Sequence, residues 1–301
     1  MLSRFPEFEP IAITSRETIN AIIDKFPPYS DFNFVSLYSW DIKNSMQVSE
    51  LDGNLVVLFK DYTSDKAFLT FIGDSDVDKT IETLLKYAPE HGLGTRLHLI
   101  PEHMITLIKD LGKFTITEDP DNHDYIILAL KLSELKGQQY ASKRKGVKRF
   151  QSNYAGRYQA RKVPINEQTA REIVNTFHSW HAESGKNHDE IADEQAALEK
   201  ILSSAQHLPL DALGIYIDDV MVAYAIYELQ GEYAIGHFMK ASRGHKGLYD
   251  YLKHVSATDI HLQGAKYINY EQDLGIEGLR KSKLLLRPES FLKKYTVSLA
   301  A

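Results

Sequence analysis

The order of secondary-structure elements that the sequence predicts is the same in both halves of the chain, and this repetition limits the fold more than any other feature. In the first half, two strands flank a turn at Asp52-Gly53, which is a strong signal for a β-hairpin. A third strand, a helix, a strand and a second helix follow. The second half repeats this order around a turn at Asp218-Asp219. Because strands and helices do not simply alternate, we expect an α+β fold, with a mixed, mainly antiparallel sheet flanked by helices in each half.

Hydrophobic periodicity and turn signals place the individual elements. The predicted helices cover residues 15–26, 76–88, 102–111, 138–158, 167–183, 189–205, 247–263 and 276–283. The predicted strands cover residues 46–51, 55–60, 67–72, 96–100, 125–130, 212–217, 220–229, 233–239 and 266–271. The length of 301 residues suits two domains, since a domain has about 150 residues. We therefore predict an N-terminal domain over residues 1–135 and a C-terminal domain over residues 136–301.

The composition excludes several classes of site. The sequence has no cysteine, which rules out disulfides, thiolate zinc sites and cysteine nucleophiles. The residues after Met1 form no apolar signal segment, and nowhere do about 18 apolar residues follow one another. The sequence thus predicts no membrane span and a cytoplasmic location. A net charge of −6 does not by itself indicate a nucleic-acid partner.

One stretch of the chain is strongly positive, in contrast to the negative net charge. Residues 135–166 contain nine lysines and arginines and no acidic residue. Within it, the predicted helix at residues 138–158 has an apolar side and a side with four cations, Arg144, Lys145, Lys148 and Arg149. A rigid row of cations suits the phosphates of a polyanion. The alternative is a solvated basic helix that serves solubility.

A second group of charged residues follows the last long strand. Asn269 lies on this strand, Glu271 ends it and Asp273 comes two residues later, at the carboxyl end where α/β sites often lie. Arg280 and Lys283 lie on the helix that follows. We predict that Glu271 and Asp273 act as general base and as anchor for a substrate ammonium, while the two cations hold a phosphate or an oxyanion. An ordinary ion-pair network is the alternative.

Two weaker patterns carry little weight. His178 and His181 lie three residues apart on a predicted helix, but they have no companion cluster, and we predict no metal site. The segment Arg243-Gly244-His245-Lys246-Gly247 precedes a helix but matches neither common glycine-rich nucleotide motif.

The sequence resembles the family related to the C-terminal catalytic domain of phosphatidylglycerol lysyltransferase, also called the DUF2156 type, over nearly its whole length. Four segments carry the resemblance: Phe5-Pro6-Glu7-Phe8, Leu37-Tyr38-Ser39-Trp40, Tyr140-x-Ser142-Lys143-Arg144 with Phe150, and the run from Asn269 to Lys283. The resemblance implies two tandem GNAT-like acyltransferase folds, in agreement with the repeated order of elements.

The resemblance also implies an activity. Better-known relatives transfer an aminoacyl group from a charged tRNA, so we expect tRNA or another phosphate-bearing acyl donor as partner, no cofactor, and an amine or hydroxyl acceptor on a small molecule or lipid headgroup. Two alternatives stay open. One is an N-acyltransferase that uses acyl-CoA, although the GNAT pyrophosphate-loop pattern is not met at Arg243. The other is a non-catalytic nucleic-acid-binding or regulatory protein that retains the fold.

Overall fold

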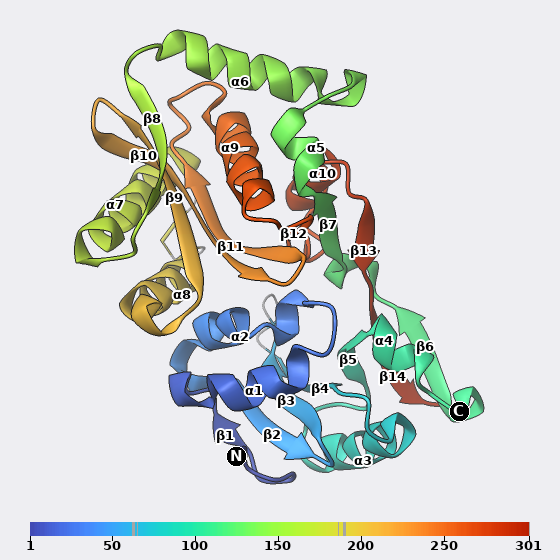
Figure 1. Ribbon diagram of the computed structural model, residues 1–301. Helices are drawn as coiled ribbons and strands as arrows, with labels where there is room; N and C mark the ends of the chain where they lie inside the picture. Colours follow the sequence, from blue (N-terminus) through green and yellow to red (C-terminus); the bar gives the residue numbers. More distant parts are fainter. Residues whose placement is uncertain (62–63, 65, 186, 189–190, 301) are drawn as a thin grey trace. The chain divides into compact units, whose positions relative to one another are not determined.

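The structure is a computed structural model that describes residues 1–300 apart from 62, 63, 65, 186, 189 and 190 (Figure 1). The chain forms two compact units, here called the first and the second unit. The first unit comprises Met1–Tyr125, Glu271–Leu285 and Ser290–Ala301, and the second comprises Ile126–Tyr270 and Leu286–Glu289. The units are defined by contacts. The predicted boundary between residues 135 and 136 concerns the two GNAT-like domains and stays a prediction.

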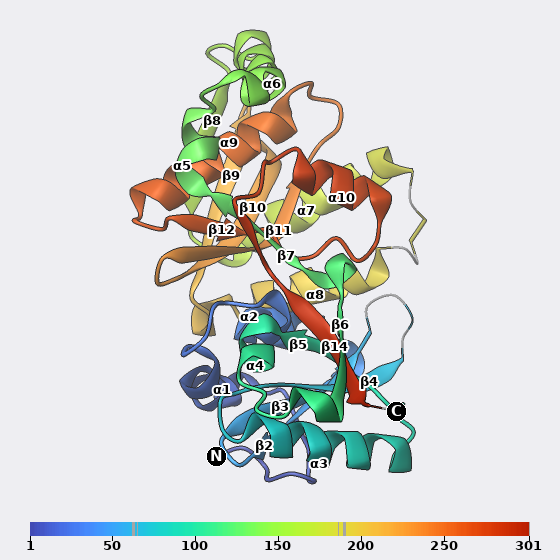
Figure 2. The same ribbon diagram turned by 90° about the vertical axis from the view of Figure 1, so that its right-hand side faces the viewer.

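The first unit contains two antiparallel sheets with the strand orders β1-β2-β3-β4 and β5-β14-β6. Its strands are β1 (Glu9–Pro10), β2 (Gln47–Leu51), β3 (Asn54–Lys60), β4 (Ala67–Ile72), β5 (Leu97–Pro101), β6 (Phe114–Glu118), β13 (Ser290–Leu292) and β14 (Lys294–Leu299). Its helices are α1 (Arg16–Ile23), α2 (Phe34–Trp40), α3 (Val77–Glu90), α4 (Glu102–Thr106) and α10 (Glu277–Leu284). Figure 2 shows β14 between β5 and β6, so the end of the chain completes this unit.

The first hairpin forms where the sequence predicts it. Leu51 pairs with Asn54, which leaves a two-residue turn in which Asp52 and Gly53 have φ angles of 51° and 90°. Positive φ at both central residues matches the right-handed twist of the flanking strands. β3 is buried on both faces between β2 and β4, since Leu55, Val56 and Val57 are all inaccessible to solvent.

The second unit is built on one sheet with the order β7-β12-β11-β10-β9-β8, and β13 pairs with β7. Its strands are β7 (Asp124–Leu128, beginning in the first unit), β8 (Tyr158–Val163), β9 (Leu210–Ile217), β10 (Val220–Gln230), β11 (Tyr233–Ala241) and β12 (Tyr267–Asn269). Its helices are α5 (Ala129–Glu134), α6 (Ala141–Asn153), α7 (Glu167–Ser184), α8 (Ala192–Ser203) and α9 (Leu248–Leu262). β11 and β12 run parallel, whereas β7 and β12 and the pairs from β8 to β11 are antiparallel.

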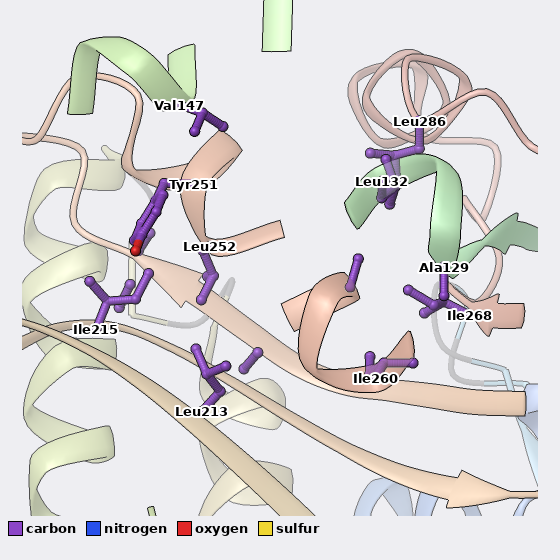
Figure 3. Packing of buried hydrophobic residues seen from close by; sticks show 14 of the residues in the cluster. Ala129, Leu132, Val147, Leu213, Ile215, Tyr251, Leu252, Ile260, Ile268 and Leu286 are labelled. Atoms are coloured by element: carbon purple, nitrogen blue, oxygen red, sulfur yellow. The ribbon is translucent and has the colours of Figure 1, made fainter. Parts of the chain in front are cut away.

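The core of the second unit lies between the sheet and helices α5, α6 and α9 (Figure 3). Leu248, Leu252 and Ile260 recur at helical spacing on α9 and belong to the same buried cluster as Leu213 and Ile215 of β9. Burying each such side chain contributes about 1.5–3 kcal/mol relative to leaving it exposed. The amphipathic pattern of the sequence therefore determines which face of α9 packs on the sheet.

The fold class predicted from the sequence is confirmed: the protein is an α+β protein with mainly antiparallel sheets flanked by helices. Both halves show a three-strand meander followed by a helix, a strand and a helix. The aromatic residues Phe32 and Phe34 belong to the core. No helix in the described part of the chain is long and apolar enough to cross a membrane.

Some predicted bounds are wrong. The helix expected at residues 102–111 ends at Thr106, and strands β6 and β14 have no counterpart in the prediction. The helix expected at residues 138–158 is shorter, since α6 ends at Asn153 and β8 begins at Tyr158. The strand expected at residues 266–271 ends at Asn269, because Glu271 takes a left-handed conformation that a strand does not allow.

Candidate functional site

The loop between β12 and α10 is held in a strained conformation. Glu271 and Leu274 both have a φ angle of 56°, a region that costs a non-glycine residue about 1–3 kcal/mol. The loop is fixed by the main chain of the first unit, because Tyr125 N donates to Glu271 O at 3.2 Å and Leu274 N donates to Asp121 O at 2.9 Å. Strain of this kind persists only where surrounding contacts impose it, and it is common at functional sites.

Asp273 is fully buried in this loop and is bound on all sides. Arg280 donates to it through Nε at 3.0 Å and through Nη2 at 2.9 Å. The Tyr125 hydroxyl donates at 2.5 Å and Gly275 N at 2.9 Å. Burial alone would raise the pKa of Asp273, but hydrogen bonds from Arg280, Tyr125 and Gly275 lower it. An ionised carboxylate with four donors is a firm structural anchor and a weak base.

Lys283, on α10, interacts electrostatically with the Glu271 carboxylate. Its Nζ donates to Gln272 O at 2.5 Å and lies 5.9 Å from the centre of the Tyr125 ring. Burial lowers the pKa of Lys283, and the Glu271 carboxylate acts in the opposite direction. A partly buried ammonium next to a carboxylate is a pair that suits proton transfer and anion stabilisation.

A buried ionic network lies directly behind the loop; we use this name for Ser30, Asp31, Asp124, Gln272 and Lys294. The Lys294 ammonium is inaccessible to solvent and pairs with Asp31 and, at 2.7 Å, with Asp124. Burial alone would lower the pKa of Lys294, but the two carboxylates raise it and keep it charged. Sequence reasoning missed this network, since its members come from segments far apart in the chain.

Asn269, also a predicted site residue, is buried at the end of β12 in the second unit. It pairs with Ile235 of β11, next to a bulge in which His237 is the extra residue between the pairs Tyr227–Gly236 and Ile226–Phe238. His237 Nε2 lies 3.2 Å from Glu228 Oε1, and both side chains are buried. The bulge was not predicted, because register shifts leave no signal in a single sequence.

Eight of the nine cations of the basic stretch differ in their partners as follows, and the ninth, Arg161, lies over the Tyr216 ring. Lys145, Lys148 and Arg149 are exposed on α6 and have no ion pair within the part of the chain that the structure describes. Arg144 instead donates to the main-chain carbonyls of Leu135 and Gly137, the latter at 2.6 Å. Four further cations of the stretch lie beside acidic residues, in the pairs Lys136–Glu134, Lys143–Asp250, Arg157–Asp218 and Lys162–Asp211. The cationic face is therefore smaller than the sequence suggests.

The loop before α9 is closed by a carboxylate from its own unit. Glu183, at the end of α7, accepts hydrogen bonds from Ser242 Oγ at 2.9 Å, from Arg243 N and from Gly244 N. Burial alone would raise the pKa of Glu183, but these hydrogen bonds lower it. Glu183 thus occupies two backbone donors of the loop that leads into α9.

The corresponding loop of the first unit, before α3, is closed by an amide. Asn54 Oδ1 accepts from Ser75 N at 3.0 Å, and its Nδ2 donates to Ser75 O at 2.6 Å. A Cβ atom on Gly73 would lie 2.1 Å from Asn54 Oδ1, so the loop has no space for a ligand at that point.

The described residues form no metal site, and two cavities lie apart from the side chains discussed above. Among the described residues, no three histidine, aspartate or glutamate side chains gather as a metal site would require. A cavity of about 420 Å³ in the first unit is lined by His98 and Asp119, among others. An open groove of about 750 Å³ in the second unit is lined by Arg171 and Glu199, among others. Neither is lined by a residue predicted to bind or react.

Comparison with known families agrees with these features. Residues 24–298 match the family described as phosphatidylglycerol lysyltransferase, C-terminal. This chain belongs to that family. The resemblance found in its sequence is confirmed. A comparison with curated proteins finds no match.

Solved structures show the same fold in other members and in proteins of similar architecture. A conserved protein of unknown function from Bacteroides thetaiotaomicron VPI-5482 has a TM-score of 0.82 and 26% identity, covering 97% of this chain and 99% of that one. L-PGS from Bacillus licheniformis has a TM-score of 0.63 and 15% identity, with coverages of 99% and 93%. A C-terminal DUF2156 domain from Agrobacterium fabrum has a TM-score of 0.65 and 14% identity, with coverages of 95% and 90%. These similarities establish the lysyltransferase C-terminal fold over nearly the full chain.

Proposed function

We propose that this protein transfers an aminoacyl group from an aminoacyl-tRNA to an amine or hydroxyl group of a small molecule or a lipid headgroup. Membership of the phosphatidylglycerol lysyltransferase C-terminal family supports acyl transfer and a lipid acceptor. The observation that favours tRNA as donor is the exposed face of α6, where Lys145, Lys148 and Arg149 remain available to phosphates. The reaction uses two substrates and no cofactor, and a tRNA donor places it in the cytoplasm.

The loop after β12 supplies groups for the chemistry. In our proposal, Glu271 accepts the proton of the acceptor group, whose lone pair then attacks the ester carbonyl carbon. The Lys283 ammonium stabilises the developing oxyanion. The bond from this carbon to the terminal ribose oxygen breaks, and that oxygen takes the proton back from Glu271. Asp273 and Arg280 hold the loop in place, because they bond to each other and to Tyr125, Gly275 and Asp121 around the loop.

The occupied loops argue against the acyl-CoA alternative. An acyl-CoA enzyme needs backbone donors for the diphosphate, and Glu183 and Asn54 occupy backbone donors of the loops before α9 and α3. The regulatory alternative is distinguished by Glu271→Gln. This substitution abolishes transfer if Glu271 accepts a proton, and it has no effect in a protein that only binds.

The direct test of the donor is salt-dependent binding of total tRNA. The variant Lys145→Ala/Lys148→Ala/Arg149→Ala should bind more weakly, and the slope of log affinity against log salt should fall by roughly 2–3, since each lost phosphate contact changes it by about 0.7–0.9. The control variant Lys136→Ala/Arg157→Ala/Lys162→Ala removes the same charge from cations that already have acidic partners. It should keep the wild-type slope. Absence of tRNA binding by the wild-type protein at low salt would refute the tRNA proposal.

A further inference from the structure

Gln272 connects the buried ionic network to the group that we assign to the oxyanion. Its side chain points into the network, where Oε1 accepts from the Ser30 hydroxyl at 2.6 Å and Nε2 donates to Asp31 Oδ1 at 3.1 Å. Its main-chain carbonyl accepts from Lys283 Nζ at 2.5 Å. One residue thus contacts the network with its side chain and Lys283 with its main chain.

The network is rigid because every member has several partners. The Ser30 hydroxyl lies 2.6 Å from Asp124 Oδ1 as well as from Gln272 Oε1, and Ser30 N donates to Asp124 Oδ2 at 2.8 Å. Lys294 pairs with both carboxylates and donates to Ser30 Oγ at 3.2 Å. Fully connected buried networks of this kind fix the groups attached to them.

An amide is the side chain that these partners require. The Ser30 hydroxyl has one proton, which Gln272 Oε1 and Asp124 Oδ1 share as acceptors, and Asp31 presents a carboxylate that accepts. Glutamine satisfies both at once, whereas a methionine of similar length satisfies neither. The chemical match implies that Gln272 is held through its side chain, and not merely by the main-chain conformation of the loop.

We propose that Gln272 is a positioning residue, fixed by the buried ionic network so that its carbonyl holds the Lys283 ammonium at the reactive position. This inference deepens the proposed function, on which the role of Lys283 rests, but it depends only on contacts inside the first unit. It predicts that side-chain substitutions in the network change the apparent pKa of Lys283, although Lys283 itself is not replaced.

The charges around Lys283 determine the direction of the effect. Burial and the Lys294 ammonium lower the pKa of Lys283, while the Glu271, Asp124 and Asp273 carboxylates raise it. If Gln272 no longer fixes the loop, Lys283 gains access to water, and its pKa rises toward the ordinary lysine value of about 10.4.

The test measures how fast Lys283 reacts with trace acetic anhydride as a function of pH, read by mass spectrometry in the full chain. Gln272→Met should raise the apparent pKa of Lys283 and slow its labelling near pH 8 by roughly tenfold for each pKa unit. Exposed Lys281 on the same helix serves as internal reference. Gln47→Met, a change of the same type on β2, should leave Lys283 as in the wild-type protein.

Ser30→Ala is the second variant, in case Gln272→Met does not fold. It removes one hydrogen bond to Gln272. It should therefore also raise the apparent pKa of Lys283, by a smaller amount. Wild-type labelling of Lys283 in a folded Gln272→Met or Ser30→Ala protein would overturn the inference. Because labelling needs no tRNA, a protein that binds no tRNA but shows the shift would refute the proposed donor and leave the positioning role standing.

Discussion

Asp273 shows how partners decide the chemistry of a single residue. The sequence predicts Asp273 as a site carboxylate in the same way as Glu271, which lies two residues away at a strand end. In the structure its two oxygens accept four hydrogen bonds, two of them from Arg280. Burial and the Asp273 carboxylate raise the pKa of Tyr125 to about 12, so its hydroxyl remains a donor. Asp273 is therefore suited to hold the loop, because its oxygens are saturated with donors.

The hydrogen bonds to Asp273 predict that the stability of the protein depends on pH. The folded-state pKa of Asp273 is lowered, so its contribution to stability is present above the unfolded value of about 3.9 and is lost as pH falls through the folded value. Arg280→Gln removes the main partner and should move the onset of acid unfolding upward by on the order of one pH unit. Acid titration followed by circular dichroism measures this shift.

A surface pair provides the matched control for Arg280→Gln. Arg171 pairs with Glu167 one helical turn away on α7, and both side chains are well exposed. Exposed pairs contribute little, so Arg171→Gln should leave the acid transition unchanged. An equal shift in both variants would mean that the burial of Asp273 is not what matters.

At the scale of the elements, α6 and α9 approach each other closely at two glycines, Gly146 and Gly247. A Cβ atom on Gly247, at the start of α9, would lie 2.2 Å from Gly146 O of α6, and one on Gly146 would lie 2.0 Å from Asp250 Oδ2. The two glycines allow a close approach that carries the apolar side of α6, with Val147 and Phe150, into the core. The cations then face outward because the opposite side is buried.

Gly247→Ala should consequently destabilise the second unit. Gly247 has a φ angle of 88° and a backbone atom in its way, whereas Gly156 has a φ angle of 75° and open space around it. Gly156→Ala should cost about 1–2 kcal/mol from the left-handed conformation alone. Gly247→Ala should cost about 1–3 kcal/mol more, since α6 must move. Denaturant unfolding of the two variants compares these costs, and equal values would show that the close contact is unimportant.

At the scale of the whole molecule, folding brings acidic residues next to several cations of the basic stretch. The net charge is −6, and the basic stretch stands out along the sequence. Acidic residues distant in the sequence, such as Asp211, Asp218 and Asp250, approach its cations in the folded second unit. What remains is a compact face on α6, which suits a few consecutive phosphates.

Each unit has a closed loop of its own before the helix that follows its three-strand meander. These helices are α3 in the first unit and α9 in the second. Because Glu183 and Asn54 occupy these loops, we expect CoA and acetyl-CoA to leave the thermal midpoint of the protein unchanged even at millimolar concentration. A ligand at 100 times its dissociation constant would add about 2.7 kcal/mol of stability, which thermal shift detects easily. A clear stabilisation would restore the acyl-CoA alternative.

The sequence alone determined the elements and their order. Local signals, such as the turn at Asp52-Gly53 and the apolar spacing of α9, act between neighbours in the chain, so a single sequence contains them. The same is true of the apolar and cationic sides of α6. The family also followed from contiguous motifs, and residues 24–298 confirm it.

Only the tertiary structure decided which of the predicted site residues keep their charge available. Asp273 is saturated by Tyr125 and Arg280, and Gln272 and Lys294 meet residues from the first half of the chain in a buried network. These contacts join segments more than a hundred residues apart, and their strength depends on burial. A sequence read locally contains neither the distance between such groups nor the loss of water around them, and for this reason it identified the loop but not its supports.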